Sequence, residues 1–415
     1  MEKLVAAVRR GDPDEVRALL ESGADPDTLA EGFPVLCLAM AAYDEPVAEA
    51  LIESGAAPLR RLPDGVTPLL RAVDSGSTGL TIAVMPEPVE LRPADREELL
   101  ERARHWTRTG AEAELRRRTG ATGEAERTRV EDRIRRCHYD RLTLGGLTTR
   151  DGHAAVLSRL EADFGIRTPF GELLARALVR PDRGHAVWSE AVSTLGRRRD
   201  EDTWTAAVAL SRAFDRVHRL FAADVLLALH VGDAFGHVPF DGRGQEVFLP
   251  WAAEEQDPEV LAAVLNGLTE EDGPQIEAMG LSYRAHPHPV VRALVLEALE
   301  RGEDRLLVRP ANLATVFALA RDPDERVRRN ACEWLAHYPE RSPEIGDALA
   351  ALTHDPLQAV RAHAVYGLAE HDDPRCVEGD RRIGPVDPDG PWYDDWVLGA
   401  TRRYEWRRED AAEGS

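Results

Sequence analysis

The chain has 415 residues, of which 43% are hydrophobic and 30% are charged, and its formal net charge is −22. This length exceeds that of one ordinary compact domain, so several units or an elongated array are expected. The strong negative charge argues against nonspecific binding to nucleic acid or to an acidic membrane surface.

Lysine and cysteine usage bear on the genome composition and on the kinds of site that the chain can form. Lys3 is the only lysine, and this preference for arginine resembles an actinobacterial, GC-rich composition. The four cysteines lie far apart without a CxxC pair, which argues against a zinc knuckle or a redox motif; they are Cys37, Cys137, Cys332 and Cys376. No apolar stretch approaches the roughly 20 residues that a membrane span needs, and the first residues show no cleavage signal. We therefore predict a soluble, cytoplasmic protein without a cofactor.

The tetrapeptide DPDE at Asp12–Glu15 predicts the start of a helix. Its first aspartate can cap the exposed amides, proline suits the first helical position, and glutamate can reach back to the cap. Behind it, Val16, Leu19 and Leu20 form an apolar stripe at helical spacing, and Gly23 provides the left-handed residue that ends many helices.

This helical unit recurs along the chain. The segment ESGADP at Glu21–Pro26 returns as ESGAAP at Glu53–Pro58, 32 residues later. A period of this length with helix, turn and helix resembles ankyrin repeats, and TPL at Thr67–Leu69 fits the helix-opening signature of that family. The resemblance implies a short ankyrin-repeat module over residues 1–91, with two good repeats and a third that loses its second helix.

The next segment, residues 92–165, is interpreted as a charged helical connector. Between Arg92 and Arg150 there are 15 arginines and 11 acidic residues, a local charge of +4 in an otherwise acidic chain. The stretch RRRTGATGEAERTRVEDRIRR contains few large apolar residues and predicts a solvated helix pair with a break near Gly120–Gly123. An interaction patch is the alternative interpretation.

The C-terminal half repeats a different pattern. Valine-arginine pairs begin at Val291, Val327 and Val360, spaced by 36 and 33 residues, each in a helix behind a turn with proline. A second DPDE, at Asp322–Glu325, opens one of these helices. Helix, DP turn and helix resembles HEAT repeats, over residues 166–370 and most regularly from Gln245. The predicted fold class is therefore all-α, an alpha-solenoid with an ankyrin-repeat module and a HEAT-like superhelix in which stacked neighbours complete the core.

Arginine recurs at matching positions of these repeats, at Arg292, Arg328 and Arg361. In HEAT-like arrays such arginines pair with acids of the neighbouring repeat, so the resemblance implies a polar ladder. Ligand binding is the alternative.

The second helix of one repeat and the tail supply candidate contact residues. Trp334 and His337 offer an aromatic anchor of the kind enriched at binding hot spots, with core packing as the alternative. The tail, residues 371–415, is expected to cap the last repeat, with an aromatic partner-binding segment as the alternative. The predicted partner-binding residues are Arg328, Arg329, Trp334, His337, Trp392 and Trp396.

No group of residues predicts a catalytic, cofactor-binding or metal site. His286 and His288 in HPHP are interpreted as turn residues, and Asp241–Gly244 lacks the context of a phosphate loop. Cys137–Asp140 gathers a thiol, an imidazole and a carboxylate, but adjacent helical positions would hold them apart.

Both resembled families mostly bind other macromolecules over extended concave surfaces. The resemblance therefore implies a noncatalytic protein-binding scaffold or adaptor, whose unidentified protein partner carries basic groups that suit the acidic surface. Three alternatives stay open: a HEAT-like DNA glycosylase acting on alkylated bases, which needs a basic channel, a bilin lyase-like protein, and a helper of a biosynthetic enzyme.

Overall fold

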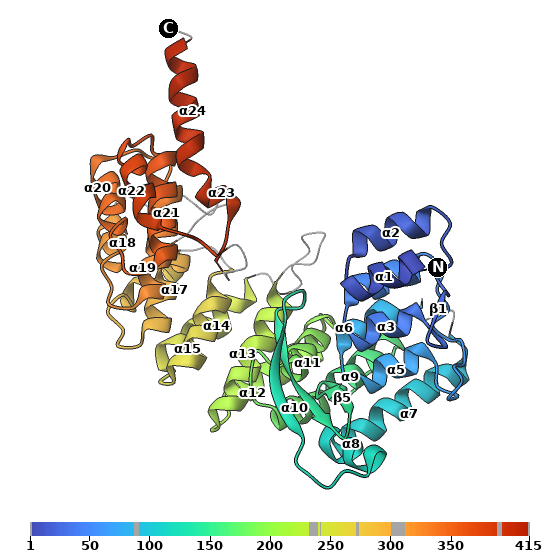
Figure 1. The fold of residues 1–415 in the computed structure, drawn as a ribbon. Coiled ribbons are helices and arrows are strands. Elements are labelled where there is room, and N and C mark those ends of the chain that lie inside the picture. Colours follow the sequence, from blue (N-terminus) through green and yellow to red (C-terminus); the bar gives the residue numbers. More distant parts are fainter. Residues whose placement is uncertain are drawn as a thin grey trace. The chain divides into compact units, whose positions relative to one another are not determined.

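The structure is a computed structural model that describes residues 2–86, 91–231, 240, 242–270, 274–299, 312–387 and 392–413. It is mostly helical and divides into two compact units, Met1–Ala206 and Ala207–Ser415 (Figure 1). Helices stack in successive pairs within each unit, which confirms the predicted alpha-solenoid. Across these described ranges, no helix combines the length and the apolar character needed to cross a membrane.

Unit 1 opens with three helix pairs, in which each pair packs on the next. The third pair includes a second helix over Thr78–Val84, so the expected loss of that helix is wrong. The hairpin of β1 (Leu29–Ala30) and β2 (Phe33–Pro34) joins the first pair to the second. The helices of the three pairs are α1 (Glu2–Arg10), α2 (Pro13–Glu21), α3 (Val35–Ala41), α4 (Glu45–Glu53), α5 (Pro68–Asp74) and α6 (Thr78–Val84).

Local capping signals place these helices. The Asp12 side chain accepts a hydrogen bond from the Glu15 amide at 2.9 Å, and Pro13 occupies the first turn of α2. Thr67 caps α5 in the same way and accepts from the Leu70 amide at 3.2 Å. The helix starts predicted from DPDE and TPL are therefore confirmed.

The rest of unit 1 combines helices with a three-stranded antiparallel sheet in the order β3-β4-β5. The helices α7 (Pro93–Thr109) and α9 (His153–Asp163) pack on the third helix pair. The strand β4 (Cys137–Leu144) packs against α8, which precedes it in the sequence, and α11, which follows it. The elements are α7 (Pro93–Thr109), α8 (Ala111–Thr119), β3 (Glu126–Asp132), β4 (Cys137–Leu144), β5 (Leu147–Arg150), α9 (His153–Asp163), α10 (Phe170–Val179), α11 (Ala186–Gly196) and α12 (Glu201–Leu210).

The sheet corrects the prediction for the connector. α8 ends at Gly120, where φ is 69°, as the predicted break requires, but Glu126–Arg150 forms strands rather than a second helix (Figure 1). In β4, Leu142 and Leu144 are buried at alternate positions, and Gly145–Gly146 turns the chain with φ of 57° and 81°. This pattern of period two and the two-residue glycine turn favour a hairpin.

Unit 2 is built from stacked helix pairs. The helices α13, α15, α17, α19 and α21 contact one another in series, and α15, α17, α19 and α21 each pack on the helix before them. The elements are α13 (Arg216–His230), α14 (Arg243–Glu254), α15 (Pro258–Leu268), α16 (Pro274–Ser282), α17 (Pro289–Leu299), α18 (Leu313–Leu319), α19 (Glu325–His337), α20 (Pro343–Leu352), α21 (Gln358–Glu370), α22 (Arg375–Ile383), α23 (Asp395–Leu398) and α24 (Ala400–Glu413).

The second DPDE copy starts its helix differently from the first. α19 is capped by Asp324, whose side chain accepts from the Arg326 amide at 3.0 Å. Asp322 therefore lies before the helix, and its two carboxylate oxygens accept hydrogen bonds from the Arg292 guanidinium, each at 2.7 Å. The helix start is confirmed, but the capping residue is the second aspartate because the first belongs to the neighbouring repeat's ion pair.

The predicted arginine ladder is present. One repeat after the pair of Arg292 and Asp322, Arg328 donates to both carboxylate oxygens of Asp355, at 2.6 and 3.1 Å. Arg361 ends the series by donating to two backbone carbonyls at the end of α22. Each guanidinium also donates to two carbonyls of the turn that opens its own helix. The ladder thus joins adjacent repeats and fixes each turn.

The tail packs against the last repeat. α23 and α24 pack against α21, and Val397 and Tyr404 are buried in the core of unit 2. Trp392 packs half-buried against the same core, whereas the Trp396 side chain is 62% exposed. Asp394 caps the single turn of α23, and that turn places Val397 rather than Trp396 in the core, so only Trp392 takes part in the cap.

Candidate functional site

A groove with a cavity volume of about 690 Å³ lies in unit 2. Its walls are the helices α17, α19 and α21 together with the tail at α23. We call it the unit 2 groove, and it is lined by Leu296, Glu297, Arg329, Asn330, Glu333, Trp334, His337, His363, Tyr366, Asp394, Trp396 and Val397.

The structure brings together most of the residues predicted to bind a partner. Arg329, Trp334 and His337 line the groove from α19, and Trp396 lines it from the tail. The two others lie elsewhere: Arg328 belongs to the ladder, and Trp392 packs in the cap. Residues that the sequence separates by about 60 positions therefore share one concave surface.

Trp334 is both a core residue and part of the groove lining. Its side chain is 4% exposed, and its ring centroid lies 5.2 Å from that of Tyr338. The indole Nε1–H has no hydrogen-bond partner among the described residues. A buried donor without a partner costs free energy, so this N–H lowers the stability that the packed indole would otherwise provide.

Two histidines of the groove are oriented by their own helices. His337 and His363 donate from Nδ1 to the carbonyls of Glu333 and Ala359, at 2.8 and 2.9 Å. Nε2 of His337 then lies 3.4 Å from the Tyr366 hydroxyl, which can donate a hydrogen bond to it. Nε2 of His363 lies 3.4 Å from the Glu333 carboxylate, which it reaches as a donor only when protonated.

Trp396 forms the exposed aromatic wall of the groove. The guanidinium carbon of Arg403 lies 3.8 Å from the centre of its ring, a cation–π contact within the tail. The charged lining residues are one arginine, Arg329, and three carboxylates, Glu297, Glu333 and Asp394. The groove is therefore aromatic and richer in carboxylates than in arginine.

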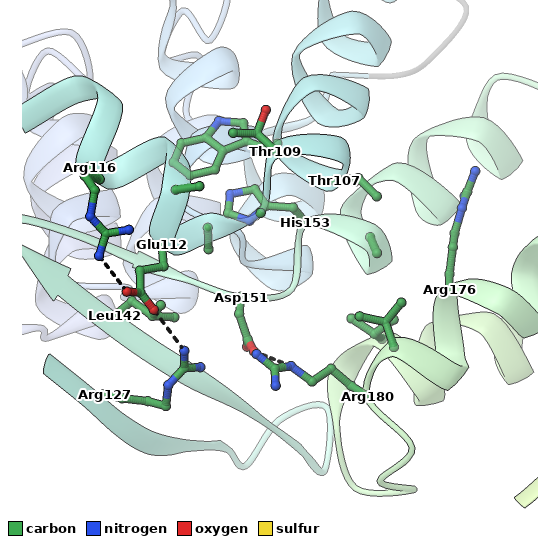
Figure 2. A pocket seen from close by; sticks show the side chains of 17 residues that line it. Thr107, Thr109, Glu112, Arg116, Arg127, Leu142, Asp151, His153, Arg176 and Arg180 are labelled. Carbon is green, nitrogen blue, oxygen red and sulfur yellow. Dashed lines mark hydrogen bonds and ion pairs between the residues drawn. The ribbon is translucent and has the colours of Figure 1, made fainter. Parts of the chain in front are cut away.

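A second cavity, of about 440 Å³, lies within unit 1 (Figure 2). Its walls come from the end of α7, the start of α8, β3, β4, the start of α9, α10 and α11. We call it the unit 1 pocket. Its apolar walls include Ala111, Ala113, Leu142, Ala154, Val179 and Val187.

Two stacked rings form part of the unit 1 pocket. The His153 and Trp106 rings lie 4.2 Å apart at an interplanar angle of 4°. Both are held by Asp74: its carboxylate accepts from Trp106 Nε1, and its backbone carbonyl accepts from His153 Nε2 at 3.2 Å. Arg118 also binds the Asp74 carboxylate and lies over the indole, 4.5 Å from its centre. The stack is therefore rigidly positioned.

Burial sets the chemistry of the His153 ring. Its side chain is almost inaccessible, and burial lowers its pKa to about 4. The ring is therefore neutral near pH 7. Because Nε2 donates to Asp74, Nδ1 carries the lone pair and can only accept a hydrogen bond.

The charged groups around the unit 1 pocket are arranged in pairs. Figure 2 shows the Glu112 carboxylate between Arg116 and Arg127, and Asp151 paired with Arg180. The two Glu112 ion pairs measure 2.9 and 3.6 Å, and the Asp151 pair measures 3.1 Å. The remaining lining arginine, Arg176, binds two glutamates. The pocket thus presents both signs of charge around apolar walls.

The sequence did not predict this pocket, because its lining comes from elements spread over about 80 residues and includes strands that were expected to be helical. The pairing of neutral His153 with Trp106 depends on packing and leaves no short motif. The one local signal is Gly110, which separates two helices and leaves the second without a capping side chain.

The Cys137–Asp140 residues lie on a strand, where adjacent side chains point to opposite faces. Cys137 is 5% exposed, and burial raises the pKa of its thiol to about 11. His138 instead binds Asp182 at 3.1 Å and Arg129 at 3.0 Å. The thiol and the imidazole therefore do not form a nucleophile and base pair.

The other candidates of the sequence lie in turns. The His288 amide donates to His286 Nδ1 at 3.1 Å, a contact inside the turn before α17. Asp241 lies outside the described residues, and the rest of its DGRG segment leads into α14.

Comparisons with known proteins agree with the repeat architecture of unit 2. The family model of HEAT repeats matches residues 276–369, from α16 to α21. A search of curated proteins finds no match.

Two solved structures are similar at low sequence identity. The YibA protein of Escherichia coli is 15% identical, with 57% of this chain and 93% of that chain covered and a TM-score of 0.43. An engineered protein is 13% identical, with 98% and 99% covered and a TM-score of 0.35. From the family match and its own helix pairs, the chain is an alpha-solenoid that carries HEAT repeats at residues 276–369.

Proposed function

We propose that the protein is a noncatalytic scaffold that binds a segment of a partner protein in the unit 2 groove. The observation that carries the proposal is the convergence of Trp334, His337 and Trp396 on one cavity of about 690 Å³. Repeat solenoids commonly use such concave surfaces for binding.

The groove chemistry supports a segment with a basic residue beside an apolar one. The exposed face of Trp396 would cover an apolar side chain, as aromatic anchors do at interfaces. Glu333 and Asp394 would attract a lysine or arginine.

The proposal includes an ankyrin-like module at the N-terminus and a cytoplasmic location. The three helix pairs between Glu2 and Val84 and the 32-residue return of ESGA support the first. The four cysteines, all free, support the second, because free thiols persist in a reducing compartment.

A displayed library of random peptides tests the groove. We expect selection on the full chain to enrich peptides with a lysine or arginine next to an apolar residue. Trp396→Ala should weaken their binding at least about tenfold, through loss of the aromatic contact. Trp406→Ala is the matched control, since Trp406 is also 62% exposed but does not line the groove, and it should leave affinity unchanged. Dissociation constants measured by fluorescence anisotropy give the comparison.

A second variant tests the charge preference. Glu333→Gln should weaken the binding of basic peptides several-fold at low ionic strength and less at high ionic strength, because salt screens the attraction that the substitution removes. Selected peptides that lack basic residues, or that bind wild type and Trp396→Ala equally, would contradict the proposal.

A further inference from the structure

We infer that the unit 1 pocket binds a small zwitterion with an apolar side chain, of the class of apolar α-amino acids. The inference does not depend on the function proposed for the unit 2 groove. It rests on a hydrogen-bond acceptor and a set of hydrogen-bond donors, all unpaired, that line one apolar cavity.

The first of these atoms is a hydrogen-bond acceptor. The His153 side chain is 3% exposed, and its Nε2 is committed to the Asp74 carbonyl at 3.2 Å. Nδ1 of the same ring has no hydrogen-bond partner among the described residues, and the ring lines the pocket (Figure 2). Because the neutral ring cannot donate from Nδ1, an occupant must bring a donor hydrogen to it, and an ammonium group does so.

The second set is a group of donors at the start of α8. Gly110 occupies the N-cap position with φ of 81° and has no side chain to cap the helix. The first intrahelical bond runs from the Glu114 amide to the Gly110 carbonyl at 3.0 Å, so the amides of Ala111, Glu112 and Ala113 have no carbonyl partner in their helix. Gly110 and these three residues line the pocket. The positive end of the helix dipole favours a carboxylate there.

The apolar walls favour an apolar side chain on the ligand, and the paired charges favour a ligand without net charge. Leu142, Val179 and Val187 offer apolar contacts in a cavity of about 440 Å³, which suits one small side chain. The surrounding arginines are already paired with carboxylates, as Glu112 is with Arg127. A multiply charged anion would have to break these pairs, whereas a zwitterion adds no net charge.

The rigid back of the pocket favours binding without rearrangement. The stacked rings are held by Asp74 through a side-chain and a backbone contact, and Arg118 fixes the same carboxylate. A preformed site loses little conformational entropy when a ligand binds. The ammonium of the ligand then meets His153 and its carboxylate meets the start of α8.

Isothermal titration calorimetry of the full chain with L-phenylalanine and L-leucine tests the inference. We expect at least one of them to bind with a dissociation constant below about 1 mM. For the amino acid that binds, the analogue without the ammonium (3-phenylpropanoate or 4-methylpentanoate) and the analogue without the carboxylate (2-phenylethylamine or isopentylamine) should each bind at least about tenfold more weakly, because each leaves one set of polar atoms unpaired.

Two variants locate the site. Ala111→Pro removes one amide N–H at the first helical position, where proline is tolerated, and should weaken binding about fivefold or more. Ala111→Gly keeps that N–H and should leave affinity within about twofold. His153→Phe keeps a stacking ring without the acceptor and should weaken binding at least about tenfold, with its melting temperature as a check of folding.

Two kinds of result would overturn the inference. No heat with either amino acid at about 10 mM, or equal binding of the amino acid and both analogues, would overturn the inference. Binding that Ala111→Pro and His153→Phe both leave unchanged would place the ligand elsewhere and overturn it as well. None of these results depends on peptide binding in the unit 2 groove.

Discussion

Replacing Arg328 by alanine is expected to lower the free energy of unfolding of unit 2 by about 3–5 kcal/mol, because it leaves a buried carboxylate without its cation. The Asp355 side chain is 4% exposed, and Arg328 is its bidentate partner. The same substitution removes the donor to the carbonyls of Asp322 and Pro323. Urea denaturation of the full chain, followed by circular dichroism, measures the loss.

A matched control lies two residues earlier on the same helix. Arg326 pairs with Asp324, but its side chain is 56% exposed. Arg326→Ala should therefore lower the free energy of unfolding by less than about 1 kcal/mol. If the two alanine variants unfold at the same urea concentration, the ladder is not a source of stability.

A double variant isolates the pair itself. Arg328→Ala with Asp355→Ala should be less destabilised than the sum of the single variants by about 1 kcal/mol or more, because neither partner then stays buried and alone. Additive effects would show that the two side chains act independently. Any loss of partner binding by Arg328→Ala is expected to follow from this destabilisation, since Arg328 does not line the groove.

Replacing Glu45 by glutamine is expected to stabilise unit 1 by about 1–3 kcal/mol at pH 8 and to have little effect near pH 4.5. Glu45 is 8% exposed at the start of α4. Burial, and after it the nearby Asp132 charge, raise the pKa of its carboxyl to about 7. Arg135 lies 3.5 Å away and opposes this shift, but its effect on the pKa is smaller than that of burial.

The surroundings explain why the charged carboxylate is poorly tolerated. A Cβ atom on Gly79 of α6 would lie only 1.7 Å from Glu45 Oε1, so the carboxyl is packed directly against that helix. Asp132, 7% exposed, has one carboxylate oxygen without a hydrogen-bond partner in the described part of the chain. The negative charge of Asp132 nearby makes a second negative charge on Glu45 unfavourable.

The direction of the pH dependence follows from these facts. The folded chain keeps the Glu45 proton up to about pH 7, whereas the unfolded chain releases it near 4.5. The folded state therefore binds more protons between these values, and stability falls as the pH rises through that window. Glutamine stays neutral, so this part of the pH dependence should disappear.

Thermal denaturation between pH 4.5 and 8 measures the effect. Glu49→Gln on the same helix is the control, because Glu49 is exposed, and it should leave the pH profile unchanged. A Glu45→Gln curve parallel to that of the wild type would contradict the assignment.

Local patterns in the sequence determined the helix starts and the repeat architecture. Caps such as Asp12 and Thr67 act within three residues, and recurring arginines such as Arg328 act between adjacent repeats, so spacing alone predicts them. The same kind of signal was available for the sheet. Alternating leucines before Gly145–Gly146 indicate a hairpin, whereas the surrounding charged residues favour a solvated helix pair.

Only the tertiary structure decided where the functional surfaces lie. Trp334 and Trp396 meet because stacked repeats and a folded-back tail bring distant segments together, and local spacing carries no such information. The pocket around His153 likewise needs helices and strands from across unit 1. The proton affinities of His153 and Glu45 depend on desolvation, which is a property of the packed interior and has no counterpart in a short stretch of sequence.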